Sequence, residues 1–332
     1  MKALMRAAPV FVVLGIALLS LLLWALDQGP MDLALWQALS DGLRGESSMA
    51  GIIVWEVRLP RVLLAVLVGG ALGLAGAAMQ GFLRNPLADP GILGVSGSAA
   101  FGAVLVLYFG WAQLGWFMLP LGGLLGALAA VVLILLLAGR ASDDATLVLA
   151  GLAVSSFAAA LIALTLNLAR SPYAMSEMVY WMLGSVANRS MLHVQIVLPF
   201  LLTGSLMLLA GWRYLEVLTL GNETAHAMGF KPQHWRWWLV CGIALCVGAA
   251  VSVSGAVGFV GLMVPHLVRP LVGFRPGVLM PASALAGSVL LLLADLLVQA
   301  LPGKPLQLGV VTALMGAPFF FYLVMHQRRS FA

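Results

Sequence analysis

The chain has 332 residues, of which 62% are hydrophobic and only 9% are charged, whereas a soluble domain carries about a quarter charged residues. This leaves too few polar side chains to cover a water-exposed surface, which excludes an ordinary soluble domain and predicts an all-α polytopic membrane protein. The net charge of +5 indicates membrane orientation rather than nucleic-acid binding, so no nucleic-acid partner is expected.

The first apolar run follows a short basic N-terminus. Lys2 and Arg6 precede an apolar segment over residues 9–27, an order that also occurs in secretory signal peptides. The segment is long enough to span a membrane, and no convincing small-x-small cleavage site follows it. We therefore expect an uncleaved first transmembrane helix.

Ten apolar segments are long enough to cross a bilayer, which takes about 20 helical residues. With ten spans, both termini lie on one side of the membrane. That side holds eleven of the 17 Lys and Arg residues, so the positive-inside rule places the termini in the cytoplasm. The predicted spans are residues 9–27, 58–79, 91–110, 114–138, 145–168, 191–211, 236–254, 257–274, 279–299 and 307–326.

Two outer connections between these spans are long enough to hold structure of their own. Residues 28–57 form a periplasmic connection, and the helical spacing of apolar residues at 31–43 predicts a short amphipathic helix lying at the interface. Residues 169–190 contain a segment too short to span. It is either a half-helix that dips towards the membrane centre or a plain outer loop.

The most polar segment is the cytoplasmic connection at residues 212–235. Its sequence predicts a glycine turn, a capping residue at Asn222 and a short helix that ends near Gly229. A helix held across the end of a membrane bundle suits the binding of a soluble partner. An ordered loop without a partner is equally compatible with the sequence.

The sequence offers few candidate residues for catalysis, metal binding or nucleotide hydrolysis. Asp295 is the one clear acidic candidate inside a predicted span. The five histidines are scattered, and Cys241 and Cys246 lack the spacing of a metal site. No G-x-x-x-x-G-K-[ST] phosphate-binding motif occurs. We therefore expect no enzyme activity and no bound metal, and the energy for active transport would come from a separate subunit.

Six motifs follow one another along the chain: RLPR at 58–61, GAAMQGFLRNPLADPGILGVSGSAA at 76–100, WMLGS at 181–185, LGNETAHAMGF at 220–230, GFVGLMVPHLVR at 258–269 and GVVTALMGAPFF at 309–320. With these motifs the chain resembles the permease subunits of FecCD-type ABC importers, which take up ferric siderophores, haem or cobalamin. The resemblance covers nearly the whole length. It implies a single transmembrane domain over residues 1–332 with the ABC type II importer permease fold of about ten helices.

The resemblance also implies the partners. Such permeases are homodimers in the bacterial inner membrane, with a pore on the twofold axis, two cytoplasmic ATPase subunits and a periplasmic substrate-binding protein. The ATPases would bind ATP and Mg²⁺, and this chain would hold no cofactor. Its ATPase-coupling segment would consist of Gly221, Asn222, Glu223, Thr224, Ala225, His226, Ala227, Met228 and Gly229.

The RLPR motif implies a docking site for the binding protein. Arg58 and Arg61 would receive acidic residues of that protein, or they would only anchor the start of the second span by snorkelling. Many relatives carry an arginine one turn after the residue that matches Asp295, where this chain has Gln299. Lys304 lies in the same outer loop and is the candidate replacement.

Two turns resemble the cytoplasmic gates of the family. In the turn at 81–90, Asn85 and Leu87 fall where the family narrows its pore, and two prolines stiffen the backbone. The second gate would lie after the fourth span, where small hydroxyl residues are known and this chain carries two acids. Its residues are Ser142, Asp143 and Asp144.

The expected function is the permease subunit of an ATP-driven importer for an iron chelate, haem or a ferric siderophore, working by alternating access. A cobalamin importer is the main alternative. A secondary transporter without an ATPase is disfavoured by the scarcity of charge within the spans. A membrane-anchored interaction scaffold is the third class.

Overall fold

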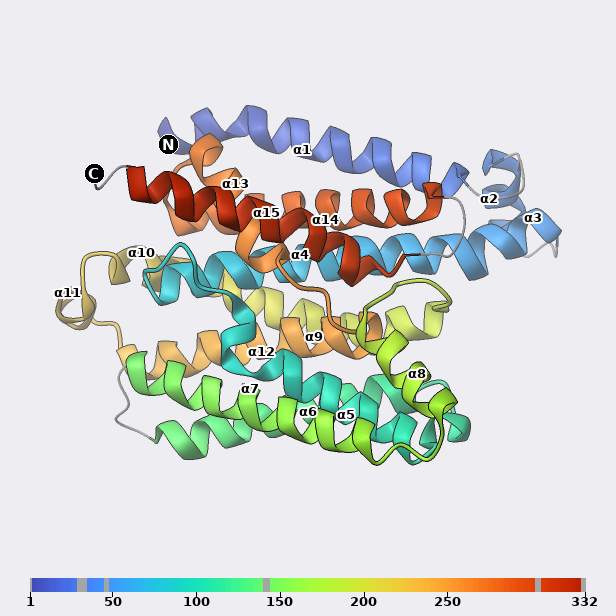
Figure 1. Ribbon diagram of the computed structural model, residues 1–332. Coiled ribbons are helices and arrows are strands. Elements are labelled where there is room, and N and C mark those ends of the chain that lie inside the picture. The colour runs from blue at the N-terminus through green and yellow to red at the C-terminus, as the bar shows by residue number, and fades with distance from the viewer. Residues whose placement is uncertain (1, 29–34, 45–47, 140–143, 302–305, 330–332) are drawn as a thin grey trace.

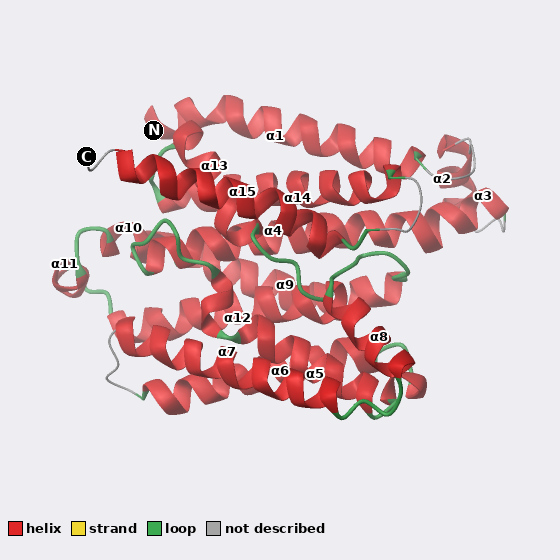
Figure 2. Cartoon of the chain, viewed as in Figure 1, coloured by secondary structure: helices red, strands yellow, loops and turns green. Residues whose placement is uncertain are grey.

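The computed structural model describes all of the chain except residues 1, 29–34, 45–47, 140–143, 302–305 and 330–332 (Figure 1). The described part consists of helices and short connections, without strands (Figure 2). Its α-helices are α1 (Lys2–Asp27), α2 (Leu35–Arg44), α3 (Met49–Ile52), α4 (Leu59–Phe82), α5 (Val95–Tyr108), α6 (Met118–Ala138), α7 (Asp144–Asn167), α8 (Pro172–Met182), α9 (Met191–Ala210), α10 (Trp212–Leu218), α11 (Asn222–Ala227), α12 (Pro232–Ser254), α13 (Val260–Val272), α14 (Pro276–Ala300) and α15 (Leu308–Arg329).

Within the described residues, seven helices are long and apolar enough to cross a membrane, and α5, α13 and α15 add three shorter apolar helices. Each of the ten predicted segments corresponds to one of these helices, which confirms the all-α membrane class. The second span is longer than predicted. A π-helical turn at Ile53–Arg58 joins α3 to α4, so that one helix runs from Met49 to Phe82.

Different short helices lie at the two ends of the bundle. Helices α2, α3 and α8 lie at one end, while α10, α11 and both chain termini lie at the other (Figure 1). Both termini therefore share one end, as an even number of spans requires. The short segment predicted within residues 169–190 is the helix α8, and the described part of the 31–43 segment lies within α2.

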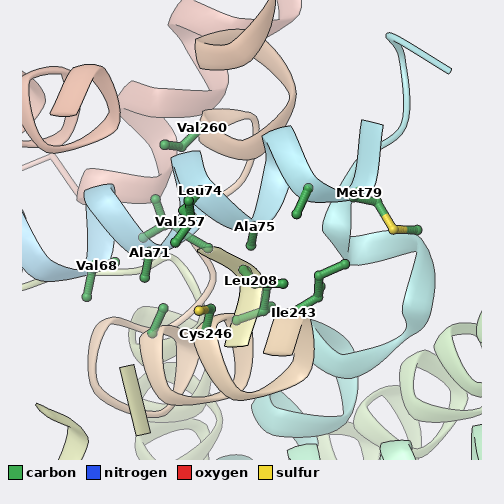
Figure 3. Close-up of a cluster of buried hydrophobic side chains, with 14 of the residues drawn as sticks. Val68, Ala71, Leu74, Ala75, Met79, Leu208, Ile243, Cys246, Val257 and Val260 are labelled. Atoms are coloured by element: carbon green, nitrogen blue, oxygen red, sulfur yellow. The ribbon is translucent and has the colours of Figure 1, made fainter. Parts of the chain in front are cut away.

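The core of the bundle lies around α4 and α12, whose apolar stretches are 78% buried. Side chains from four helices meet there, among them Leu74 of α4, Leu208 of α9, Ile243 of α12 and Val260 of α13 (Figure 3). Small residues let the helices approach closely. At Gly69, for example, a Cβ would overlap the carbonyl oxygen of Gly287 in α14.

The predicted span at 257–274 is wrong in its first part, because the chain is not helical before Val260. Gly255 and Phe259 have φ angles of +67° and +66°, in the left-handed region that interrupts a right-handed helix. Helix α13 therefore has only 13 residues, too few to cross a bilayer alone.

The segment between α4 and α5 is irregular in the same way. A 3-10 turn at Pro90–Leu93 precedes α5, and the carboxylate of Asp89 accepts a hydrogen bond of 2.7 Å from the backbone of Gly91. A cavity of about 170 Å³ separates this segment from Val257 and Gly258. The two irregular stretches thus line one cavity, and backbone without helical bonds is tolerated at membrane depth where it lines a cavity or is buried in protein.

Candidate functional site

The segment predicted to couple to the ATPase forms a short helix at the end of the bundle. Helix α11 lies between Gly221 and Gly229, whose φ angles of +107° and +87° favour glycine. Gly221, and not Asn222, occupies the capping position, so the predicted cap at Asn222 is wrong by one residue. Leu220 and Met228 flank the helix and are 68% and 59% exposed.

Aromatic packing holds α11 to its neighbours. Ala225 of α11 is fully buried, and its carbonyl oxygen accepts a bond of 3.1 Å from the backbone of Phe230. Phe230 contacts both Tyr214 of α10 and Trp235 of α12, and these two rings stack 5.8 Å apart. Burial raises the pKa of the Tyr214 phenol. A displacement of α11 would therefore be transmitted to α10 and to the start of α12.

Asp144, one of the predicted gate residues, joins three separate parts of the chain. It lies in the first turn of α7, where Oδ1 is 3.1 Å from Arg236 of α12 and Oδ2 is 3.5 Å from Arg84 of the turn after α4. The predicted partners Ser142 and Asp143 lie outside the described residues. Asp144 thus connects the turn after α4, which the sequence predicts to be a gate, to the helix that follows α11.

Asn85 and Leu87 shape the other predicted gate. The Asn85 side-chain oxygen accepts a bond of 2.9 Å from the Leu87 backbone, and its backbone carbonyl accepts one of 3.1 Å from Ala88. Asn85 is exposed and Leu87 is half-buried. With Pro86 between them, these bonds hold the turn in one conformation.

We predict that Asp144→Asn lowers uptake by about three- to tenfold while leaving the fold intact. The pairs are partly exposed, so each contributes only about 0.5–1 kcal/mol, but their loss leaves Arg84 and Arg236 facing one another unneutralised. Uptake in proteoliposomes and the unfolding midpoint measure the two effects. Asp144→Glu is the matched control and should retain most activity. Wild-type uptake in Asp144→Asn would contradict this role.

At the opposite end of the bundle, Arg58 is buried and bound within the chain. Its NH1 donates to the carbonyl oxygens of Leu26 and Asp27 at 2.8 and 2.7 Å. These are the last carbonyls of α1, which lack helical partners. Arg58 is only 7% exposed, so its described contacts satisfy the end of α1.

Arg61 forms a bidentate ion pair with Asp295 of α14. Nε and NH2 donate to the two carboxylate oxygens at 2.8 and 2.9 Å, and Gln299 donates a further bond of 2.9 Å to the same carboxylate. Asp295 therefore has two partners in the chain, Arg61 and Gln299. Lys304 lies outside the described residues. The network of Arg61, Asp295 and Gln299 could not be predicted from the sequence, since 234 positions separate Arg61 from Asp295.

A second polar connection was also missed. Arg269 of α13 donates a bond of 2.6 Å to the side-chain oxygen of Gln80 in α4, and the Gln80 amide donates to the carbonyl of Leu262 at 3.1 Å. The sequence feature that could have indicated this contact is the presence of a glutamine and an arginine inside apolar runs. Among the described residues, no group of three His, Cys, Asp or Glu side chains could hold a metal ion.

Comparisons with known proteins agree with this geometry. The profile of the FecCD transport family matches residues 16–326. The chain is 40% identical to an uncharacterized ABC transporter permease, YvrB of Bacillus subtilis, over 89% of this chain and 84% of that one. It is 36% identical to the vitamin B12 import permease BtuC of Citrobacter koseri, over 85% and 86% of the two chains. A solved structure described as an inward-facing conformation of a metal-chelate type ABC transporter superposes with a TM-score of 0.86 at 29% identity, covering 96% of this chain and 99% of that one.

Proposed function

This chain belongs to the FecCD transport family and is a permease subunit of an ABC importer, and we propose that its cargo is an iron chelate, either haem or a ferric siderophore. The cargo would move from periplasm to cytoplasm by alternating access. The similarity to a metal-chelate type transporter supports this class of substrate. Cobalamin is the second candidate, because several relatives are named vitamin B12 or cobalamin import permeases.

The observation that supports an ATP-driven importer is the position of α11. This exposed helix lies between two glycines at the end of the bundle that holds both termini. We propose that this end is cytoplasmic, that the chain forms a homodimer in the bacterial inner membrane, and that each subunit binds one ATPase through the segment Gly221–Gly229. ATP and Mg²⁺ would be bound by the ATPases, with no cofactor in this chain. Among the described residues, Asn85, Leu87 and Asp144 would form the cytoplasmic gate.

Reconstitution tests this function directly. Proteoliposomes that contain this permease, its ATPase and its binding protein should accumulate a ferric siderophore, haem or cyanocobalamin only when ATP is present. Competition between these three ligands identifies the cargo. Uptake by the permease alone, driven by an ion gradient, would instead establish a secondary transporter.

We further propose that Arg61 receives a carboxylate of the periplasmic binding protein. Its Nε and NH2 are occupied by Asp295, but NH1 has no partner among the described residues, and the side chain is 22% exposed. Arg58 is more deeply buried, so charge reversal at both arginines would disturb the fold as well as docking. The docking surface predicted from Arg58, Arg61 and Lys304 would thus depend on Arg61 among the described residues.

A double variant that replaces the Arg61–Asp295 ion pair with two uncharged side chains tests docking without a large loss of stability. Removing one partner of a buried ion pair is strongly destabilising, whereas Arg61→Gln combined with Asp295→Asn removes both charges together and leaves two neutral amides that can hydrogen-bond. We expect this double variant to unfold near the wild-type midpoint and to bind the binding protein about tenfold more weakly, because a charge-assisted contact is lost. Biolayer interferometry at several salt concentrations measures the affinity. Unchanged affinity would exclude docking at Arg61.

A further inference from the structure

Two neighbouring cavities lie along α6 and α12, and we refer to them together as the groove and to each as a compartment. The apolar compartment, of about 320 Å³, is lined mainly by α6 and α12, including Leu128 and Cys241, with Phe200 of α9 at its side. The second compartment, of about 610 Å³, lies between the C-terminal end of α6 and the first turns of α12, where polar side chains join the lining. Its lining residues are Leu135, Gly139, Lys231, Gln233, His234 and Trp237.

The two compartments follow one another along the same pair of helices. One helical turn separates Val131 from Leu135 on α6, and one turn separates Trp237 from Cys241 on α12. From Leu121 to Gly139, the stretch of α6 that lines the two compartments is about 27 Å long, close to the thickness of a hydrocarbon core. The groove is therefore long enough to hold an acyl chain from its polar mouth to the middle of the bilayer.

The mouth of the groove is positively charged. Lys231 is exposed and forms no ion pair with any described residue, and no side chain caps α12, whose first turn carries the positive end of the helix dipole. His234 is exposed, with its ring stacked on Trp238 at 6.2 Å. Asp144 does not neutralise this charge, because it is already bound by arginines.

We propose that this groove is a binding site for an anionic phospholipid, with the phosphate at Lys231 and His234 and one acyl chain between α6 and α12. Basic pockets between transmembrane helices on the cytoplasmic side bind anionic headgroups, and tryptophans such as Trp237 favour the headgroup level. The choice of leaflet rests on the topology proposed above, but the existence of the site does not. Its occupant would contact α12 directly after the coupling segment.

Native mass spectrometry of the purified full-length permease tests the site. With equal amounts of phosphatidylglycerol and phosphatidylcholine, the wild type should retain phosphatidylglycerol in about fivefold excess. Lys231→Gln with His234→Gln should reduce this excess towards parity without unfolding, because both side chains are exposed. Cys241→Phe should fill the apolar compartment and lower the binding of both lipids.

Arg275 supplies the matched control. Like Lys231, it is an exposed basic residue that directly precedes a proline at the start of a helix, here α14, but it does not line the groove. Arg275→Gln should leave the phosphatidylglycerol excess unchanged. The proposal is overturned if the Lys231 and His234 variant keeps the full excess, or if millimolar inorganic phosphate displaces the lipid as effectively as phosphatidylglycerol does. Neither result would affect ATP-driven uptake, so the two proposals can fail separately.

Discussion

Gly76→Ala is expected to destabilise the bundle strongly, although it adds a single methyl group. A Cβ at this position of α4 would overlap the carbonyl oxygen, carbonyl carbon and Cα of Gly261 in α13. The obstructing atoms are backbone, so no side-chain rotation can relieve the overlap, and α13 itself would have to move. Overpacking of a core typically costs about 1–3 kcal/mol, and a backbone contact lies at the upper end of that range.

The unfolding midpoint of the purified permease measures this effect. We expect a decrease of roughly 5–10 °C, or no recoverable folded protein. Gly81→Ala is the matched control in the same helix, because its Cβ would meet only side-chain atoms of Leu215 at 3.7 Å, an ordinary contact. Since alanine favours helix over glycine, the control should be neutral or slightly stabilising. Equal midpoints for the two variants would show that α4 and α13 do not pack as closely as the structure places them.

This contact also shows how much of the fold the sequence could predict. The hydropathy pattern predicted all ten apolar helices, because a run of about 20 apolar residues can be recognised from the local sequence alone. The glycines of α4 can be read from the sequence as well, but the helices that they contact cannot. That Gly69 meets α14 and Gly76 meets α13 depends on packing between segments far apart in sequence.

In the candidate site, too, local structure could be predicted from the sequence, but contacts between distant segments could not. Helix α11 could be located from its flanking glycines and polar composition, since both act over a few residues. The break before α13 was not predicted, because apolar residues such as Val257 and Phe259 gave the stretch the composition of a span. The partners of Arg58, Arg61 and Asp144 could not be predicted, because each ion pair or cap is formed across the bundle.

Leu220→Asp combined with Met228→Asp is expected to abolish ATP-driven uptake by removing the ATPase from the complex. Both side chains are large, apolar and more than half exposed beside α11, in the most polar segment of the chain. Burying one such side chain in an interface contributes about 1.5–3 kcal/mol, so replacing two with carboxylates should weaken association more than a hundredfold. Because neither side chain supports the core, the unfolding midpoint should remain unchanged.

Co-purification of the ATPase with tagged permease measures this association, and ATP-driven uptake reports its consequence. Thr219→Ala is the control in the same loop, because its exposed hydroxyl only donates to the Glu216 carbonyl oxygen and presents little apolar surface. The control should bind the ATPase normally. If the double aspartate variant retains the ATPase at the wild-type level, α11 is not the coupling helix. If it loses the ATPase yet still transports, the energy for uptake does not enter through this end of the bundle.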